Sequence, residues 1–150
     1  RIATAYFAPD DKLTELICTR AGEGVVVEIM MPGPHIDRRI SELSAAGQIS
    51  RLVDAGVHLA AFQPSMLHLK AITVDGCAAC IGSPNLNHRS QYLDDEVALI
   101  VLDEQLVRVL DEDFDADLER CEPIRSSDLR PRGLPRRAAE LVTRPSRAHF

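Results

Sequence analysis

The stretch that decides the fold is His68-Leu69-Lys70-Ala71-Ile72-Thr73-Val74-Asp75, which runs directly into Gly76. Apolar and β-branched residues recur along it, as is typical of a β-strand, and we expect the strand to cover residues 67–75. Asp-Gly is a favoured pair for a two-residue hairpin turn. A short apolar segment, residues 78–81, follows at once. The sequence therefore predicts a β-hairpin across an Asp75-Gly76 turn.

Strands and helices alternate on both sides of this hairpin. Further strands are expected at residues 1–7, 25–31, 57–62 and 97–102, and helices at residues 13–21, 36–53 and 106–118. The first helix follows a loop that ends in an aspartate N-cap, and the nearly all-apolar run at 25–31 is typical of a strand buried on both faces. The order predicts an α/β domain, with a mixed β-sheet flanked by helices on both faces and a loop over residues 82–95.

The composition is that of a single globular domain. The chain has 150 residues, of which 45% are apolar and 27% charged, close to ordinary usage. No apolar run approaches the roughly 18 residues that a membrane helix requires, and no signal peptide opens the sequence. Because residue 1 is Arg rather than Met and a strand begins there, we expect an upstream part of the protein to be missing.

Charge divides the chain into an acidic body and a basic tail. Residues 1–124 carry a net charge of −11 and residues 125–150 carry +5, which together give −6. An acidic body disfavours nucleic acid as a partner, because such binding depends on neutralising phosphates. The Arg-rich tail is interpreted as a solvated segment outside the domain, or as one that rests on an anionic membrane surface.

The four cysteines allow two interpretations. Cys77 and Cys80 form a Cys-x-x-Cys pair that suggests zinc or redox chemistry, with Cys18 and Cys121 elsewhere. However, Cys77 and Cys80 flank the return strand of the hairpin, and the other two fall on apolar helix faces. We therefore favour four buried thiols and predict no metal site.

His68 and Lys70 carry the chemistry of the predicted hairpin. Residues two apart on a strand project from the same face, so an imidazole and a fixed positive charge point the same way. A phosphoryl group needs that combination, because its transition state spreads negative charge over several oxygens. Ser83 and Asn85 offer further donors just past the neighbouring strand. We expect Glu96 to lie within reach of the imidazole, where a carboxylate would orient the ring.

Two residues beside this set remain open to both structural and chemical roles. Asp75 either belongs to the catalytic set or serves only the hairpin turn. Arg89 either clamps a phosphate or pairs with a nearby aspartate, and we favour the pairing.

The register of these residues resembles the HKD motif of the phospholipase D superfamily. His-x-Lys is followed, after four intervening residues, by Asp75, and then by Gly82-Ser83-Pro84-Asn85, Arg89-Ser90 and Glu96. Three segments resemble the cardiolipin synthase subgroup more closely: Tyr6-Phe7-Ala8-Pro9-Asp10, Gln63–His68 and Asn85–Ser90. The similarity covers about residues 1–122. We therefore predict a catalytic domain at residues 1–124, the carboxy-terminal phospholipase D-like half, and a separate tail at 125–150.

The resemblance implies a two-step phosphatidyl transfer that needs no metal or cofactor. One histidine forms a phosphohistidine, a second protonates the leaving alcohol, and phosphatidylglycerol is the donor. His68, Lys70 and Asp75 would be catalytic, with Ser83, Asn85 and Glu96 holding the phosphate. Only one motif is present, so a second HKD half is expected upstream or in a homodimer.

The same resemblance leaves the acceptor and the activity open. Water as acceptor would make the protein a phosphodiesterase of the phospholipase D type. A silent half would serve as a scaffold. The implied location is the cytoplasmic membrane, with this domain soluble at its surface and an anionic phospholipid as the substrate.

Overall fold

The structure of the chain is a computed structural model that describes residues 1–35 and 39–129. The first residues of the predicted second helix, and nearly all of the predicted tail, lie outside the described residues. Seven strands form one sheet in the order β8-β6-β5-β1-β3-β4-β9. In chain order these are β1 (Ile2–Thr4), β3 (Glu28–Pro32), β4 (His58–Phe62), β5 (Lys70–Val74), β6 (Ala78–Gly82), β8 (Ala98–Val101) and β9 (Cys121–Pro123).

The sheet is mixed, as predicted. β1, β3 and β4 run parallel to one another, whereas β5, β6, β8 and β9 each join an antiparallel neighbour. The helices are α1 (Asp11–Gly22), α2 (Arg39–Asp54), α3 (His88–Tyr92), α4 (Glu104–Leu118) and α5 (Ser126–Leu129). Two short strands, β2 (Phe7–Ala8) and β7 (Leu86–Asn87), pair in parallel as a second sheet.

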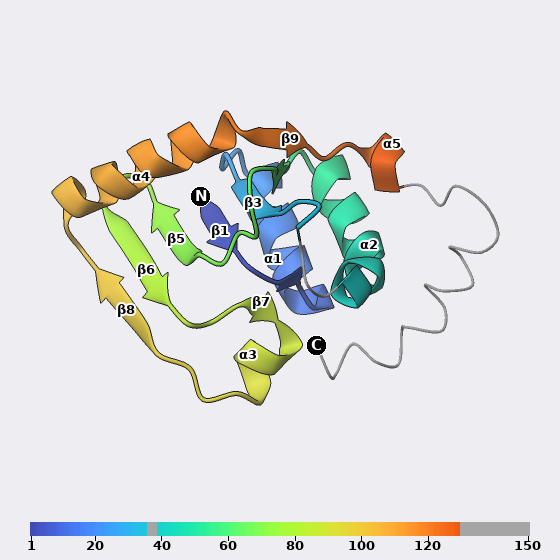
Figure 1. Cartoon of the computed structure of the whole chain (residues 1–150), viewed down its shortest axis with the longest axis horizontal. Helices are drawn as coiled ribbons and strands as arrows, with labels where there is room; N and C mark the ends of the chain where they lie inside the picture. Colours follow the sequence, from blue (N-terminus) through green and yellow to red (C-terminus); the bar gives the residue numbers. More distant parts are fainter. Residues whose placement is uncertain (36–38, 130–150) are drawn as a thin grey trace.

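Helices cover both faces of the sheet, and the side chains of β3 show it directly. Ile29 and Met31 are buried with residues of α1 and α2, whereas Met30 is buried with Phe114 of α4. Successive residues of a strand point to opposite faces, so α1 and α2 lie on one face and α4 lies on the other (Figure 1). The predicted α/β architecture with helices on both faces is confirmed.

One half of the sheet extends beyond α1 and α2. Figure 1 shows β6 and β8 reaching away from those helices. The register places Ile72, Cys80 and Ile100 in one row across β5, β6 and β8, on the same face as Ile2. Ile100 is 74% exposed. Ile72 and Cys80 are partly buried, so this apolar row becomes more open to solvent toward β8. We call the row Ile72, Cys80 and Ile100 the open face.

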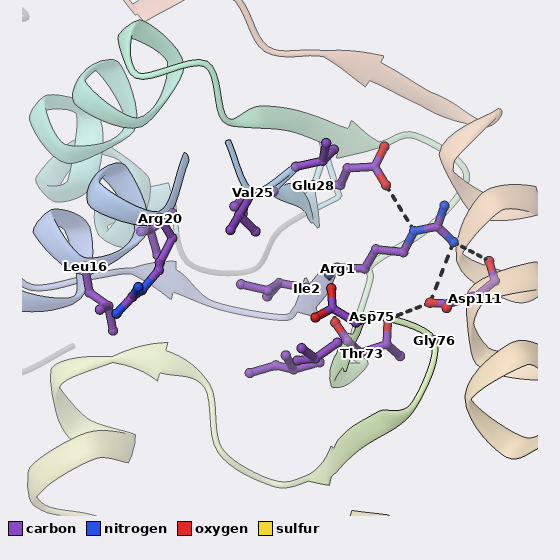
Figure 2. Close-up of a pocket in the computed structure, with 15 residues that line it drawn as sticks. Arg1, Ile2, Leu16, Arg20, Val25, Glu28, Thr73, Asp75, Gly76 and Asp111 are labelled. Carbon is purple, nitrogen blue, oxygen red and sulfur yellow. Dashed lines mark hydrogen bonds and ion pairs between the residues drawn. The ribbon is translucent and has the colours of Figure 1, made fainter. Parts of the chain in front are cut away.

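The start of the chain is tied to α4 through Arg1. Its guanidinium contacts Glu28 at 3.0 Å and Asp115 at 2.8 Å, and it lies over the ring of Phe114 (5.4 Å to the centroid). The hydroxyl of Thr73 donates to Asp111 at 2.5 Å (Figure 2). These contacts join the middle of the sheet to the helix that covers one of its faces.

Two predicted caps and turns are present. Asp10 is the N-cap of α1 and accepts a hydrogen bond from the backbone N–H of Leu13 at 2.8 Å. Asp75 and Gly76 have φ angles of 51° and 65°. Both residues thus have the left-handed backbone that Asp and Gly tolerate in tight turns. Val74 pairs with Ala78, so the connection has three residues rather than the expected two.

Several predicted boundaries were wrong. The strand expected at residues 25–31 begins only at Glu28, because Gly24, with φ of 95°, lies in the turn that ends α1. Val26 lies in that connection and is 73% exposed rather than buried. The strand expected at 1–7 is interrupted between β1 and β2, the loop expected at 82–95 contains β7 and α3, and β9 was not predicted.

The prediction of four buried thiols was also wrong. All four cysteines are free, but Cys77 is exposed because it lies in the hairpin turn, where its N–H donates to the carbonyl of Val74. Cys18, Cys80 and Cys121 are partly buried. Cys121 lies on β9, not on a helix.

Candidate active site

His68 and Lys70 lie at the start of β5, at one end of the sheet. The ammonium Nζ of Lys70 is 3.2 Å from both Nδ1 and Nε2 of His68 and 3.1 Å from the His68 carbonyl oxygen. A nitrogen equally distant from both ring nitrogens cannot lie in the ring plane, because it would collide with Cε1 between them. Lys70 therefore sits over the face of the imidazole, and its charge does not occupy the in-plane lone pair that a nucleophile uses.

The environment of Lys70 affects its protonation. Partial burial lowers the pKa of its ammonium below the ordinary value, and the negative charge of Glu96 opposes that shift. Desolvation disfavours a charged form and an opposite charge favours it. Glu96 is therefore close enough to Lys70 to help it remain a cation.

Ser83 and Glu96 form a second pair beside Lys70. The hydroxyl of Ser83 donates to Glu96 Oε2 and accepts from the backbone N–H of Val97 at 3.0 Å. The N–H of Ser83 donates to the Val97 carbonyl at 2.9 Å. Glu96 was expected to orient the imidazole of His68, but its carboxylate accepts from Ser83 instead.

Gly82 allows this close approach. A Cβ at residue 82 would lie 2.2 Å from the carbonyl oxygen of Val97 and 2.7 Å from the Cα of Ala98. Gly82 pairs with Ala98 across β6 and β8, directly before Ser83. The absence of a side chain at this position therefore brings Ser83 against the segment that carries Glu96.

Asn85 follows two residues later, before β7. Its side-chain Oδ1 is buried and has no hydrogen-bond partner among the residues that the structure describes. A buried acceptor without a donor is costly, so this amide has unused bonding capacity. A direct contact with His68 or Lys70 is not among its described interactions, and its phosphate role stays a prediction.

Asp75 lies at the opposite end of β5 from His68. It lies five positions after Lys70, which corresponds to about 16 Å along an extended strand. The structure thus brings His68, Lys70, Ser83 and Glu96 to one end of the sheet, and it leaves Asp75 in the hairpin turn.

Asp75 instead borders a pocket of about 570 Å³. Apolar side chains make up much of its wall, and Arg1, Arg20 and Glu28 stand around it (Figure 2). The apolar lining residues are Ile2, Leu16, Ile17, Val25, Val26, Val27, Ile72 and Val74. Its position at the far end of β5 separates this pocket from the four residues gathered at the other end.

Arg89 pairs with an aspartate, as we favoured. Its Nε and a terminal nitrogen donate to the two carboxylate oxygens of Asp94, at 3.1 and 2.6 Å. These hydrogen bonds lower the pKa of Asp94 and raise that of Arg89. The guanidinium is thus engaged within its own loop.

Tyr6 is a neighbour of His68 that the site prediction missed. The two ring centroids are 6.4 Å apart and the rings are nearly perpendicular, at 87°. Thr4 pairs with Lys70 in the antiparallel register of β1 and β5, and continuing that register by two residues brings Tyr6 opposite His68. The signal was therefore available in the sequence once the register was known.

Residues 1–118 match the protein family described as "Cardiolipin synthase, PLD-like domain". The chain belongs to this phospholipase D-like family. Cardiolipin synthase 2 of Bacillus cereus is 34% identical over 143 residues, which cover 95% of this chain and 28% of that protein. Cardiolipin synthase of Clostridium perfringens strain SM101 is 30% identical over 143 residues, or 95% of this chain and 30% of that protein. The chain thus spans less than a third of these relatives.

Solved structures of other proteins share the fold. The phospholipase D family member Nuc from Salmonella typhimurium superposes with a TM-score of 0.72 at 18% identity, covering 83% of this chain and 80% of that chain. Phosphatidylserine synthase from Haemophilus influenzae gives 0.76 at 19% identity, covering 99% of this chain and 39% of that chain.

Proposed function

We propose that this chain is one half of a phosphatidyltransferase of the cardiolipin synthase type, with phosphatidylglycerol as the donor. The observation that carries the proposal is the contact of Lys70 with the imidazole of His68, at 3.2 Å from both ring nitrogens. This pair occurs in a chain whose relatives are named cardiolipin synthases. A histidine with a cation over its ring is suited to a phosphodiester, because it combines a nucleophile with charge stabilisation.

In the proposed transfer, a nitrogen of one histidine attacks the phosphorus of the donor. The nitrogen–phosphorus bond forms as the bond to the leaving glycerol oxygen breaks, and a second histidine protonates that oxygen. An acceptor hydroxyl then attacks phosphorus, loses its proton to the second histidine and releases the first. His68 fills one of these two roles, and Lys70 stabilises the negative charge that develops on the phosphoryl oxygens.

Ser83, Asn85 and Glu96 support the phosphate in this proposal. Glu96 holds the Ser83 hydroxyl and strengthens the cationic form of Lys70. Asn85 contributes an amide whose oxygen has no partner among the described residues. Asp75, at the far end of β5, acts through the fold and not on the phosphate.

The second histidine comes from another phospholipase D-like half, upstream in the same protein or in a second copy. The open face defined by Ile72, Cys80 and Ile100 supports this part of the proposal. Lys70 projects from that same face of β5, because it stands two residues before Ile72. A half that covers this face would place its own residues next to Lys70. The length of the relatives, of which the chain spans 28–30% in these two cases, leaves room for such a half.

The proposed location is the cytoplasmic membrane, with this domain at its surface. An anionic phospholipid substrate requires access to a bilayer. No helix in the described residues is long and apolar enough to cross a membrane.

The test uses full-length protein and vesicles that contain phosphatidylglycerol. His68→Ala should abolish cardiolipin formation. His58→Ala is the matched control, because His58 is an exposed histidine on β4, away from His68 and Lys70. Retained transfer in His68→Ala would refute the proposal. Phosphatidic acid without cardiolipin from the unmodified protein would indicate a phosphodiesterase that uses water. If the unmodified protein forms neither cardiolipin nor phosphatidic acid, the chain is a silent half.

A further inference from the structure

Tyr6 joins the two sheets at a rigid point of the chain. Ala5 and Phe7 on either side of it are 0% and 3% exposed. β1 ends just before Tyr6 and pairs with β5, while β2 begins just after it and pairs with β7. The hydroxyl of Thr4 also donates to the Tyr6 carbonyl at 3.3 Å. The backbone of Tyr6 is therefore held from both directions.

His68 is less constrained by its own backbone. It is exposed and lies before β5 begins at Lys70. Its imidazole has Lys70 over its face and the Tyr6 ring nearly perpendicular to it, at 6.4 Å between centroids. An edge-to-face arrangement is a preferred geometry of ring pairs.

We propose that Tyr6 is a positioning residue, whose ring fixes the orientation of the His68 imidazole beneath Lys70. The role in turnover rests on the proposed function, whereas the positioning itself does not. The ring of Tyr6 carries this role. A histidine that reacts with phosphorus must present one nitrogen along a narrow direction, and small misplacements of a reacting group are costly. A ring on a doubly anchored backbone supplies that restraint.

Two variants of the full-length protein separate the ring from the hydroxyl. Tyr6→Leu removes the ring, and Tyr6→Phe keeps it. The energy of an edge-to-face pair corresponds to a loss of about two- to tenfold in rate. We expect this loss in kcat for Tyr6→Leu, with KM for phosphatidylglycerol unchanged and Tyr6→Phe within about twofold of the unmodified protein. An equal loss in Tyr6→Phe would overturn the proposal, and so would an unchanged kcat in Tyr6→Leu.

A second readout does not depend on activity. The rate at which diethyl pyrocarbonate modifies each histidine is measured by mass spectrometry of the full-length protein. Removing the ring should speed modification of His68 several-fold in Tyr6→Leu but not in Tyr6→Phe. His88, which is partly buried in α3, reports on folding and should not change. An unchanged His68 rate would refute the positioning role. If the unmodified protein transfers no phosphatidyl group while the His68 rate still responds, the proposed function fails and the contact stands.

Discussion

Gly82→Ala is the sharpest test of how the site is assembled. The new methyl group would meet the Val97 carbonyl oxygen at 2.2 Å and the Ala98 Cα at 2.7 Å. Both are backbone atoms of the adjoining segment, so β8 must move away from β6. Overpacking of this kind costs about 1–3 kcal/mol, and strain on the hydrogen bonds between Ser83 and Val97 adds about 1 kcal/mol. We expect the free energy of unfolding to fall by about 2–4 kcal/mol.

The matched control is Gly22→Ala. Gly22 lies in α1, and a Cβ there would meet nothing within 4 Å. Alanine favours a helix over glycine by up to about 1 kcal/mol, so this variant should be as stable as the unmodified chain or slightly more so. Urea unfolding followed by circular dichroism measures both variants. If Gly82→Ala unfolds at the same urea concentration as Gly22→Ala, the close approach of β6 and β8 is refuted.

Three further predictions concern charge and the hairpin turn. Glu96→Gln removes the charge that raises the pKa of Lys70. In a profile of transfer rate against pH, the fall in rate at alkaline pH should therefore begin at a lower pH, and an unchanged profile would contradict this. Arg89→Met should return the pKa of Asp94, now lowered by its hydrogen bonds with Arg89, to its ordinary value in an NMR titration. Because that pKa is lowered by folding, the stabilisation is complete above the ordinary aspartate pKa and is lost as pH falls through the lowered value. Asp75→Asn should keep stability and transfer, since asparagine tolerates positive φ, whereas Asp75→Val should cost about 1–2 kcal/mol in urea unfolding; lost transfer in a stable Asp75→Asn would restore a chemical role.

The sequence predicted those features that depend on local chemistry. The Asp75-Gly76 turn, the aspartate cap of α1 and the pairing of Arg89 each involve residues close in the chain, and each is present. The apolar run at 25–31 misled because apolar character alone does not distinguish a strand from the connection that leads into it. Gly24 ends α1 so late that Val26 falls outside the strand.

Features that depend on register were harder to predict. Spacing placed Glu96 near the site, but spacing cannot determine whether a carboxylate meets an imidazole or a hydroxyl. The contact of Tyr6 with His68 joins residues 62 positions apart and follows only from the pairing of Thr4 with Lys70. β7 and β9 have two and three residues, too few for any periodicity to appear.

Asp75 shows how a residue in the motif can serve the site from a distance. The three-residue connection of Asp75, Gly76 and Cys77 sets which residues of β5 and β6 face each other, and it pairs Ala71 with Ile81. The next position along the ladder brings Lys70 opposite Gly82, which precedes Ser83. A slip of one residue would turn Lys70 to the other face of the sheet, where α4 packs and where the imidazole of His68 does not lie. Asp75 lies about 16 Å from Lys70 along the strand. Its positive φ nevertheless helps to determine that Lys70 and Ser83 meet at the same end of the sheet.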